Sequence, residues 1–190
     1  METPDTQELA EAANDPFKTY CALLVSVLAM VLALNNLGGS NTGKEAMMNN
    51  ILAANTYSFY QAKSVRQTEY KLAADRIEMQ LATDKPTGAA KDMLEGKLAD
   101  YQKTIQRYDS EPENGEGKKE LLAKAKHLEA ERDLALRKDP WFDYAEGLLQ
   151  LAIVLTSVAI ITGRRSMFNV ALLLGMVGSL CTLNGYFLFY

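Results

Sequence analysis

A glycine-rich stretch is the part of this sequence that comes closest to a known chemical motif. Residues 38–44 read Gly-Gly-Ser-Asn-Thr-Gly-Lys, which nearly matches a phosphate-binding loop. The residue that follows is Glu45, so the hydroxyl that would bind Mg²⁺ is absent. The segment before the stretch has the character of an apolar helix, whereas the motif requires a strand. We therefore interpret the stretch as a linker that ends a membrane helix, and we expect no bound nucleotide.

The only histidine offers the second candidate site. His127 is followed four residues later by Glu131, so the two side chains could share a helix face as metal ligands. Two ligands without a cysteine or a second histidine make a poor zinc site, and a solvated helix face is the better interpretation. No Ser/His/Asp set can be assembled around this histidine, and the carboxylates are scattered along predicted helix faces. We expect no catalytic, metal-binding or cofactor-binding residue, and therefore no enzyme.

The overall charge and the cysteines add little chemistry. The net charge is −4 and no dense basic stripe appears, which argues against nucleic acid as a partner. Cys21 and Cys181 lie inside separate apolar blocks, so we interpret them as small apolar residues and not as a redox pair. Apolar residues gather near the two ends of the chain and charged residues between them, a segregation typical of membrane proteins.

Three apolar blocks are long enough to cross a bilayer, which takes about 20 helical residues. The first extends over 17–37, after an acidic tail at 1–16 that does not resemble the basic start of a signal peptide. The second extends over 141–163 and follows Pro140, which suits a helix start. The third extends over 164–190. The sequence therefore predicts an all-α membrane protein with three transmembrane helices.

Two arginines in the turn between the last two blocks predict the orientation in the membrane. Arg164 and Arg165 occupy a very short loop, where the positive-inside rule has most weight. If these side chains lie in the cytoplasm, the amino terminus is cytoplasmic too. The long middle region then lies on the other side of the membrane.

The charged middle region, 38–140, is predicted to be a helical, coiled-coil-like domain. Helix formers without proline or glycine extend over 44–82, and further helices are expected at 89–108 and 118–138. The second of these carries a short heptad seam formed by Leu94, Leu98, Tyr101, Ile105 and Tyr108. The polar turn between the second and third helices predicts that they form an antiparallel hairpin. Whether the long first helix packs on this hairpin or on that of a neighbouring copy stays open.

Two further groups of residues are candidates for contacts between copies. Gly175 and Ser179 are small residues four apart, which allow membrane helices to approach closely, either within one chain or between subunits. Tyr57, Phe59 and Tyr60 cannot all face one core from a single helix, so part of this cluster is expected to meet another helix or another chain. Together with the heptad seam, these residues form the candidate oligomer interface.

The sequence also resembles a known family. The apolar amino-terminal helix is followed by Tyr-Ser-Phe-Tyr-Gln-Ala-Lys-Ser-Val-Arg-Gln at 57–67, then by Ala-Glu-Arg-Asp at 130–133 and a membrane hairpin. Over nearly the whole chain these features are similar to the bacterial membrane proteins grouped as domain of unknown function 4337. The resemblance implies a bacterial inner (cytoplasmic) membrane location, with the middle domain in the periplasm. It brings no activity and no catalytic residue.

These observations favour a non-enzymatic membrane scaffold that self-associates through its membrane helices and its coiled-coil domain. A short hairpin buries little apolar surface alone, and neighbouring copies would supply the rest. One alternative is an oligomeric pore or transport component, for which a thin polar stripe is offered by Ser26, Asn35, Asn36, Thr156 and Ser157. Another is an accessory subunit of a larger membrane complex. The expected partners are further copies of the chain, the lipid bilayer and, for an accessory subunit, other membrane proteins.

Overall fold

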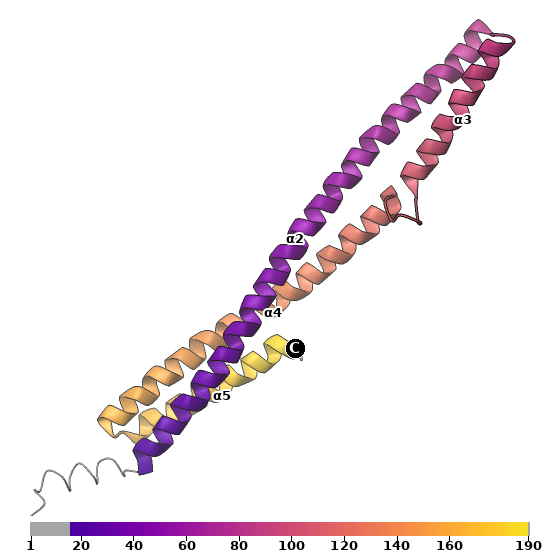
Figure 1. The fold of residues 1–190 in the computed structure, drawn as a ribbon. Helices are drawn as coiled ribbons and strands as arrows, with labels where there is room; N and C mark the ends of the chain where they lie inside the picture. Colours follow the sequence, from indigo (N-terminus) through magenta and orange to yellow (C-terminus); the bar gives the residue numbers. More distant parts are fainter. Residues whose placement is uncertain (1–15, 190) are drawn as a thin grey trace, which may run out of the picture. The chain divides into compact units, whose positions relative to one another are not determined.

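The computed structural model describes residues 16–189, which fold into four helices without a strand in that range (Figure 1). The helices are α2 (Pro16–Asp84), α3 (Ala89–Asp109), α4 (Lys118–Thr162) and α5 (Arg165–Phe187). Helices α2, α4 and α5 are each long and apolar enough to cross a membrane. The predicted all-α class with three membrane-capable helices is therefore confirmed. The acidic tail predicted at 1–16 lies outside the described residues except for its last residue.

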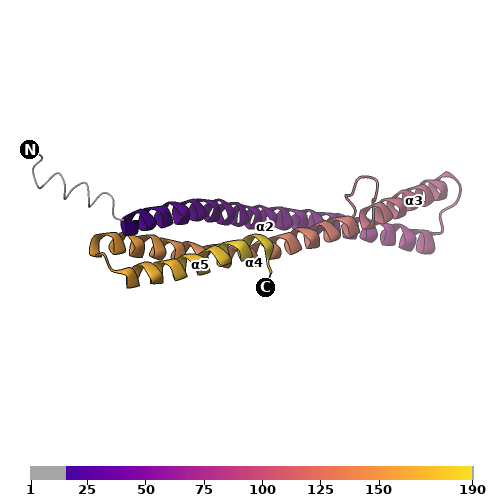
Figure 2. The same ribbon diagram turned by 90° about the horizontal axis from the view of Figure 1, so that it is seen from below.

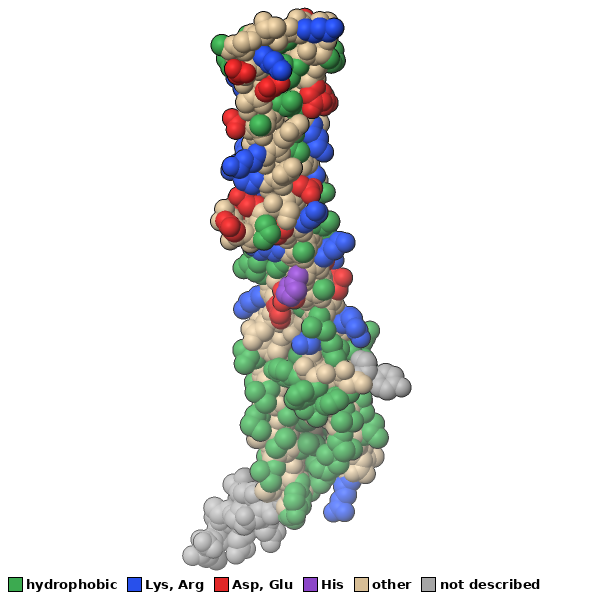
Figure 3. All heavy atoms as spheres, turned by 90° about the vertical axis from the view of Figure 1, so that its right-hand side faces the viewer, with side chains coloured by type: hydrophobic (Ala, Val, Ile, Leu, Met, Phe, Trp, Pro, Cys, Tyr) green, Lys and Arg blue, Asp and Glu red, His purple; other side chains and the backbone are tan. Residues whose placement is uncertain are grey.

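The chain divides into two compact units. The membrane unit holds the described residues up to Ala46 together with those from Asp133 onward, and the charged unit is Met47–Arg132. In Figure 3 part of the surface is almost uninterrupted hydrophobic side chains, while Lys, Arg, Asp and Glu are spread over the rest. The segregation seen in the sequence thus persists as two surfaces of different character.

The glycine-rich stretch does not break the chain, which corrects the predicted linker at 38–43. Helix α2 continues through this stretch without interruption. Glycine is unfavourable in an isolated helix, but it lets a second helix approach closely, and that contact outweighs its low propensity. An ideal Cβ on Gly38 would lie 2.6 Å from the ring of Phe142, so only glycine leaves room for that ring. The helix predicted to begin at Lys44 is therefore the continuation of the first membrane helix.

Pro140 does not start a helix either, which corrects the second predicted boundary. It lies inside α4, so the helix expected at 118–138 and the second membrane helix are one element. Proline removes one backbone hydrogen bond and disfavours a helix interior. Here the flanking residues Ala135, Phe142 and Ala145 are all buried, so packing on both sides of the proline holds the helix together.

The inward face of α2 follows a repeat of seven residues along the helix. Every seventh residue from Cys21 to Ile77 is buried or half-buried. The nine positions are Cys21, Leu28, Asn35, Thr42, Asn49, Thr56, Lys63, Tyr70 and Ile77. A seven-residue spacing keeps one line of side chains facing a neighbouring helix over many turns. Most of these side chains are small or polar, so apolar periodicity does not reveal the repeat.

In the membrane unit, helices α2, α4 and α5 pack around one aromatic ring. Phe142 of α4 is 2% exposed, and ideal Cβ atoms on Gly38 of α2 and Gly185 of α5 would each lie within 3 Å of its ring. Tyr186 of α5 stacks edge-on against the same ring, with centroids 5.1 Å apart. A cluster around Leu28 and Leu149 continues the packing away from this ring. We call the space that Gly38 and Gly185 leave for this ring the Phe142 socket.

In the charged unit, α3 and the first part of α4 both pack on α2, which corrects the predicted hairpin between 89–108 and 118–138. The two helices follow one another along α2, as Figures 1 and 2 both show. Tyr70 of α2 contacts both Tyr101 and Tyr108 of α3, with ring centroids 5.5 and 5.8 Å apart. Tyr57 of α2 donates a hydrogen bond to Glu129 of α4. The long helix therefore packs on segments of its own chain.

A single methyl group added at Gly38 tests the Phe142 socket. We expect Gly38→Ala to destabilise the membrane unit by about 1–3 kcal/mol, because the added Cβ overpacks the site. Gly147→Ala is the matched control, since a Cβ there meets nothing within 4 Å. It should be neutral or stabilising by up to about 1 kcal/mol. Thermal unfolding of the helical circular dichroism signal in detergent measures both, and equal effects of the two substitutions would contradict the socket.

Candidate functional site

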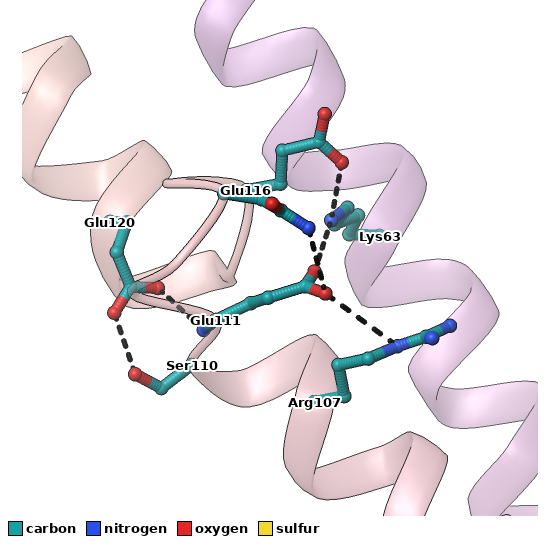
Figure 4. Close-up of polar contacts among 7 residues, drawn as sticks. Lys63, Arg107, Ser110, Glu111, Glu116 and Glu120 are labelled. Atoms are coloured by element: carbon teal, nitrogen blue, oxygen red, sulfur yellow. Dashed lines mark hydrogen bonds and ion pairs between the residues drawn. The ribbon is translucent and has the colours of Figure 1, made fainter.

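The charged unit buries the amine-bearing side chain of Lys63. This residue lies on the inward face of α2 and is 6% exposed. Its Nζ is 3.4 Å from a carboxylate oxygen of Glu116 and 3.8 Å from one of Glu111 (Figure 4). It also lies over the rings of Phe59 and Tyr108, at 5.3 and 5.7 Å from their centroids. We call this cluster the Lys63 junction.

One turn further along α2, Gln67 bonds both neighbouring helices. Its amide nitrogen donates to the backbone carbonyl of Ile105 in α3, at 2.9 Å. Its amide oxygen accepts a hydrogen bond from Lys118 at the start of α4, also at 2.9 Å. Lys118 in turn lies 5.5 Å from the ring centroid of Tyr60. Because Gln67 is 4% exposed, its two bonds fix the ends of α3 and α4 against α2.

The turn between α3 and α4 is held by a carboxylate at the start of α4. Glu120 accepts hydrogen bonds from the hydroxyl of Ser110 (2.6 Å) and from the backbone N–H of Glu111 (3.1 Å). A Cβ added to Gly117 would clash with the carboxylate of Glu120 and with the backbone of Ser110 and Glu111, so a side chain would not fit there. These contacts hold the glutamates of the turn beside Lys63 (Figure 4).

Hydrogen bonds and nearby charges shift the pKa values of four ionisable groups in the charged unit. The hydrogen bond and charge of Lys119 hold the pKa of Asp109 below its ordinary value of 3.8, and Asp109 raises the pKa of Lys119 above 10.5. The hydrogen bond from Ser110 lowers the pKa of Glu120 below 4.5. The hydrogen bond to Glu129 raises the pKa of Tyr57 above 10.0. Each shift favours the protonation state found at neutral pH.

The membrane unit contains its own polar contact between three helices. The amide nitrogen of Asn35 in α2 donates to the backbone carbonyl of Phe142 in α4, at 2.9 Å. Its amide oxygen accepts from the hydroxyl of Thr182 in α5, at 3.0 Å. The hydroxyl of Tyr186 donates to the backbone carbonyl of Leu34, at 2.9 Å. Asn35 is 1% exposed, so all of its bonding capacity faces the interior.

The polar residues considered for a pore are largely bonded inside the chain. The hydroxyls of Ser26, Thr156 and Ser157 each donate to the carbonyl four residues earlier in their own helix. Asn35 lies in the three-helix contact, and Asn36 is exposed beside Asp139. Because these hydrogen bonds lie within one chain, they do not support a polar stripe that lines a pore.

Most residues of the candidate oligomer interface contact their own chain. Tyr57, Tyr60, Tyr101 and Ile105 take part in the bonds and ring contacts described above, and Leu94 and Leu98 are half-buried. Gly175 is buried against Leu28, and Ser179 donates to the carbonyl of Gly175. Phe59, with 42% of its surface exposed, is the most open member of the set.

The two candidate chemical motifs take ordinary helical forms. Residues 38–44 lie within α2, where helical hydrogen bonding already uses the backbone N–H groups that would bind a phosphate. His127 lies 3.6 Å from Glu131 on an exposed face of α4. Among residues 16–189, no group of three or more His, Cys, Asp or Glu side chains is placed to hold a metal ion. The turn residues Arg164 and Arg165 are exposed.

Sequence reasoning missed Lys63 and Gln67 and considered Asn35 only as part of a pore-lining stripe, because each is a polar residue on a face expected to be apolar. One signal was available. Asparagine or threonine recurs every seven residues at 35, 42, 49 and 56, and the same spacing leads to Lys63. A search for polar residues at heptad spacing would have identified this face. The Lys63 junction and the Asn35 contact both join helices, because in each of them a polar side chain of one helix bonds to polar atoms of neighbouring segments.

Comparison with known proteins gives one match. A family model described as a domain of unknown function (DUF4337) matches residues 17–188. No curated protein and no solved structure matches the chain.

The Lys63 junction predicts a specific loss of stability. We expect Lys63→Met to destabilise the charged unit by about 1–3 kcal/mol, because Glu111 loses its buried partner. The matched control is Lys91→Met, which breaks an exposed pair with Glu95 and should cost about 0.5 kcal/mol or less. Denaturant unfolding measures the loss, and limited proteolysis reports whether the turn at 110–117 opens. A turn that resists protease equally in both variants would contradict a holding role for Lys63.

Acid should weaken the same turn. The folded-state pKa values of Asp109 and Glu120 are lowered, so their stabilisation is complete above their ordinary values of 3.8 and 4.5 and is lost as pH falls further. The raised pKa of Lys119 acts only above 10.5, so its contribution is constant across the acid range. We expect the unfolding temperature of the charged unit to fall below about pH 4.5.

The substitution Ser110→Ala separates the contribution of Glu120 from the rest. Without the Ser110 hydroxyl, the pKa of Glu120 returns toward 4.5, so the acid-induced loss becomes smaller while stability at neutral pH also falls. Unfolding temperatures of the variant and the parent protein across the acid range make the comparison. An equal decrease in unfolding temperature at every pH would show that the Ser110 hydroxyl does not lower the pKa of Glu120.

Proposed function

The chain belongs to the family of domain of unknown function DUF4337, and since this family brings no activity with it, we propose from the geometry that the protein is a non-enzymatic, self-associating membrane scaffold. The observation that carries this proposal is the set of contacts made by the buried amine of Lys63. A buried amine is a common catalytic group, yet this amine is bound to two carboxylates and lies over two rings. Its contacts hold α2, α3 and the turn before α4 together.

The buried amide of the membrane unit supports the same conclusion. An unpaired amide in hydrocarbon is costly, and Asn35 meets this demand with bonds to both other membrane helices. In each unit, therefore, the polar groups that could bind or react with a small molecule instead connect helices. A protein built in this way is suited to holding a shape and presenting a surface.

Self-association is supported by the apolar side chains that stay exposed outside the membrane unit. Met47, Met48, Leu72 and Met79 of α2 each have more than half of their surface exposed. Large apolar side chains left in water are unfavourable, and a contact with another molecule would bury them. The scaffold proposal assigns this surface to contacts with further copies of the chain. It also places the charged unit as a coiled-coil domain on the periplasmic side of a bacterial inner membrane.

The orientation is supported by the charge at the two ends of the membrane unit. Phe17 contacts Phe168 with ring centroids 5.8 Å apart, so Lys18 lies at the same end as Arg164 and Arg165. At the other end, a cleft between α2 and α4 is lined by Asp139, Asp143 and Glu146. Lys44, Arg137 and Lys138 also lie at this second end, but they adjoin a long region, which can be translocated largely regardless of its charge, whereas Arg164 and Arg165 lie in a very short loop, where the positive-inside rule has most weight. The amino terminus then lies in the cytoplasm.

The mass of the native particle tests the proposal. Extracted gently from its own membrane into mild detergent, the protein should form a particle holding several copies of the 21.0 kDa chain and no other protein. A particle that contains unrelated chains at fixed ratio would favour the accessory-subunit alternative. A strict monomer at all protein concentrations would contradict self-association, and solute flux through reconstituted vesicles would favour the pore.

The orientation has a separate test. The double substitution Arg164→Glu, Arg165→Glu should expose the charged unit of a fraction of molecules to the cytoplasm, because the retained charge changes sign. Lys97→Glu with Lys103→Glu makes the same charge change on α3 and should leave the orientation unchanged. Protease added to spheroplasts reads out which molecules present residues 47–132 outside. Full cleavage of the arginine variant would show that Arg164 and Arg165 do not set the orientation, and protection of the parent protein would contradict the proposed orientation itself.

A further inference from the structure

A groove runs between α2 and α5 in the membrane unit. It has a volume of about 410 Å³ and is lined from α2 by Leu24, Val27 and Leu28, and from α5 by residues within the range 172–183. Val27 and Met176 have 52% and 54% of their surface exposed, so the groove is open along one side. We call it the α2–α5 groove.

The lining of this groove selects an apolar occupant. Its side chains are Leu, Val and Met, together with the hydroxyl of Ser179. That hydroxyl donates to the backbone carbonyl of Gly175 at 2.8 Å, so its proton is already used inside α5. A polar occupant would lose its bonds to water here and gain few in return. The groove therefore suits a hydrocarbon.

The dimensions of the groove select an extended chain. Its α5 side is about 16 Å long, which matches one leaflet, half of a hydrocarbon layer about 30 Å thick. Its volume divided by this length gives a cross-section of about 25 Å². A helix with its side chains is at least about 10 Å across, a cross-section of about 80 Å². A helix of a second copy is therefore too wide, whereas one acyl chain fits.

Two side chains suited to a lipid headgroup lie beyond one end of the groove. Arg165 is seven residues before the first lining residue of α5, which places it on the groove side of that helix, about 10 Å outside the groove. Tyr20 is four residues before the first lining residue of α2 and is 63% exposed. Both lie at the same end of the membrane unit, because Phe17 contacts Phe168 there.

The chemistry of these two residues favours an anionic headgroup. A guanidinium binds a phosphate through two parallel hydrogen bonds, and tyrosine is typical of the headgroup layer. Arg164 and Arg165 are both exposed and adjacent, so this end carries concentrated positive charge. An anionic lipid neutralises that charge, whereas a zwitterionic lipid brings a cation of its own.

We propose that the α2–α5 groove binds one acyl chain of an anionic phospholipid whose phosphate is bound by Arg165. The chain fills the groove over one leaflet, and the headgroup lies between Arg165 and Tyr20. This inference goes beyond the scaffold function and does not depend on self-association. It requires only that the membrane unit lies in a bilayer, for which α2 and α5 are long and apolar enough.

Native mass spectrometry in mild detergent tests the headgroup, with phosphatidylglycerol and phosphatidylcholine of identical acyl chains as the two probes. We expect the parent protein to retain one phosphatidylglycerol per chain in preference to phosphatidylcholine. Arg165→Gln should weaken the retention of phosphatidylglycerol about fivefold, the effect of one basic residue at an anionic surface. Arg137→Gln removes an exposed arginine outside the groove and should change neither lipid. Equal retention of both lipids by the parent, or no effect of Arg165→Gln, would overturn the proposal.

Filling the groove provides the second measurement. Val27→Phe should weaken the retention of both lipids about tenfold or more, the affinity that two buried methylene groups contribute. Met30→Phe is the control, since Met30 is 61% exposed on α2 and lies outside the groove lining. Unchanged lipid retention in the Val27 variant would overturn the groove as the binding site. A smaller native particle with unchanged lipid retention would show that a second copy occupies the groove, which also overturns the proposal.

Discussion

The structure depends on one constraint, the seven-residue repeat of inward positions along α2. Small and polar side chains at these positions let α4, α5 and α3 approach α2 closely, each within its own unit. A repeat of this kind works only if the helix is unbroken, because one inserted residue would turn everything beyond it by about 100°. Asn49 and Lys63 would then leave the interior, and side chains unsuited to the contact would enter it.

A repeat of small side chains does not define its own register, because sliding a partner helix by seven residues restores a similar surface. The buried polar groups remove this ambiguity. Asn35 pairs with one carbonyl of α4 and one hydroxyl of α5, and a shifted partner would leave its amide unbonded in an apolar surrounding. Lys63 and Gln67 act similarly in the charged unit, where a shift would separate the amine from Glu111. Polar burial thus provides specificity, while glycine and alanine provide proximity.

Sequence reasoning succeeded where composition decides the outcome and failed where packing does. The membrane-capable segments follow from length and apolarity, and α3 begins at the predicted residue, Ala89. The helix boundaries expected at Gly38 and Pro140 are absent. Helix propensity describes an isolated helix, whereas here the ring of Phe142 in α4 packs against Gly38 in α2 and stabilises both helices. We expected α3 to pair with the start of α4, because a polar turn joins the two helices. Both pack instead on the longer helix α2. The polar character of Asn35 and Lys63 concealed the inward face from a search for apolar periodicity.

Hydrogen exchange along α2 tests the central claim, that α2 is one helix with one continuous inward face. The amides of residues 38–43 are the deciding ones, since this segment was expected to be a linker. We expect that in a lipid nanodisc they exchange as slowly as the amides of the flanking turns, because all of them are bonded within α2 and the segment begins with Gly38 and Gly39 packed against Phe142. Fast exchange confined to residues 38–43 would show a break in the helix, and the inward repeat could not then pass from the membrane unit into the charged unit.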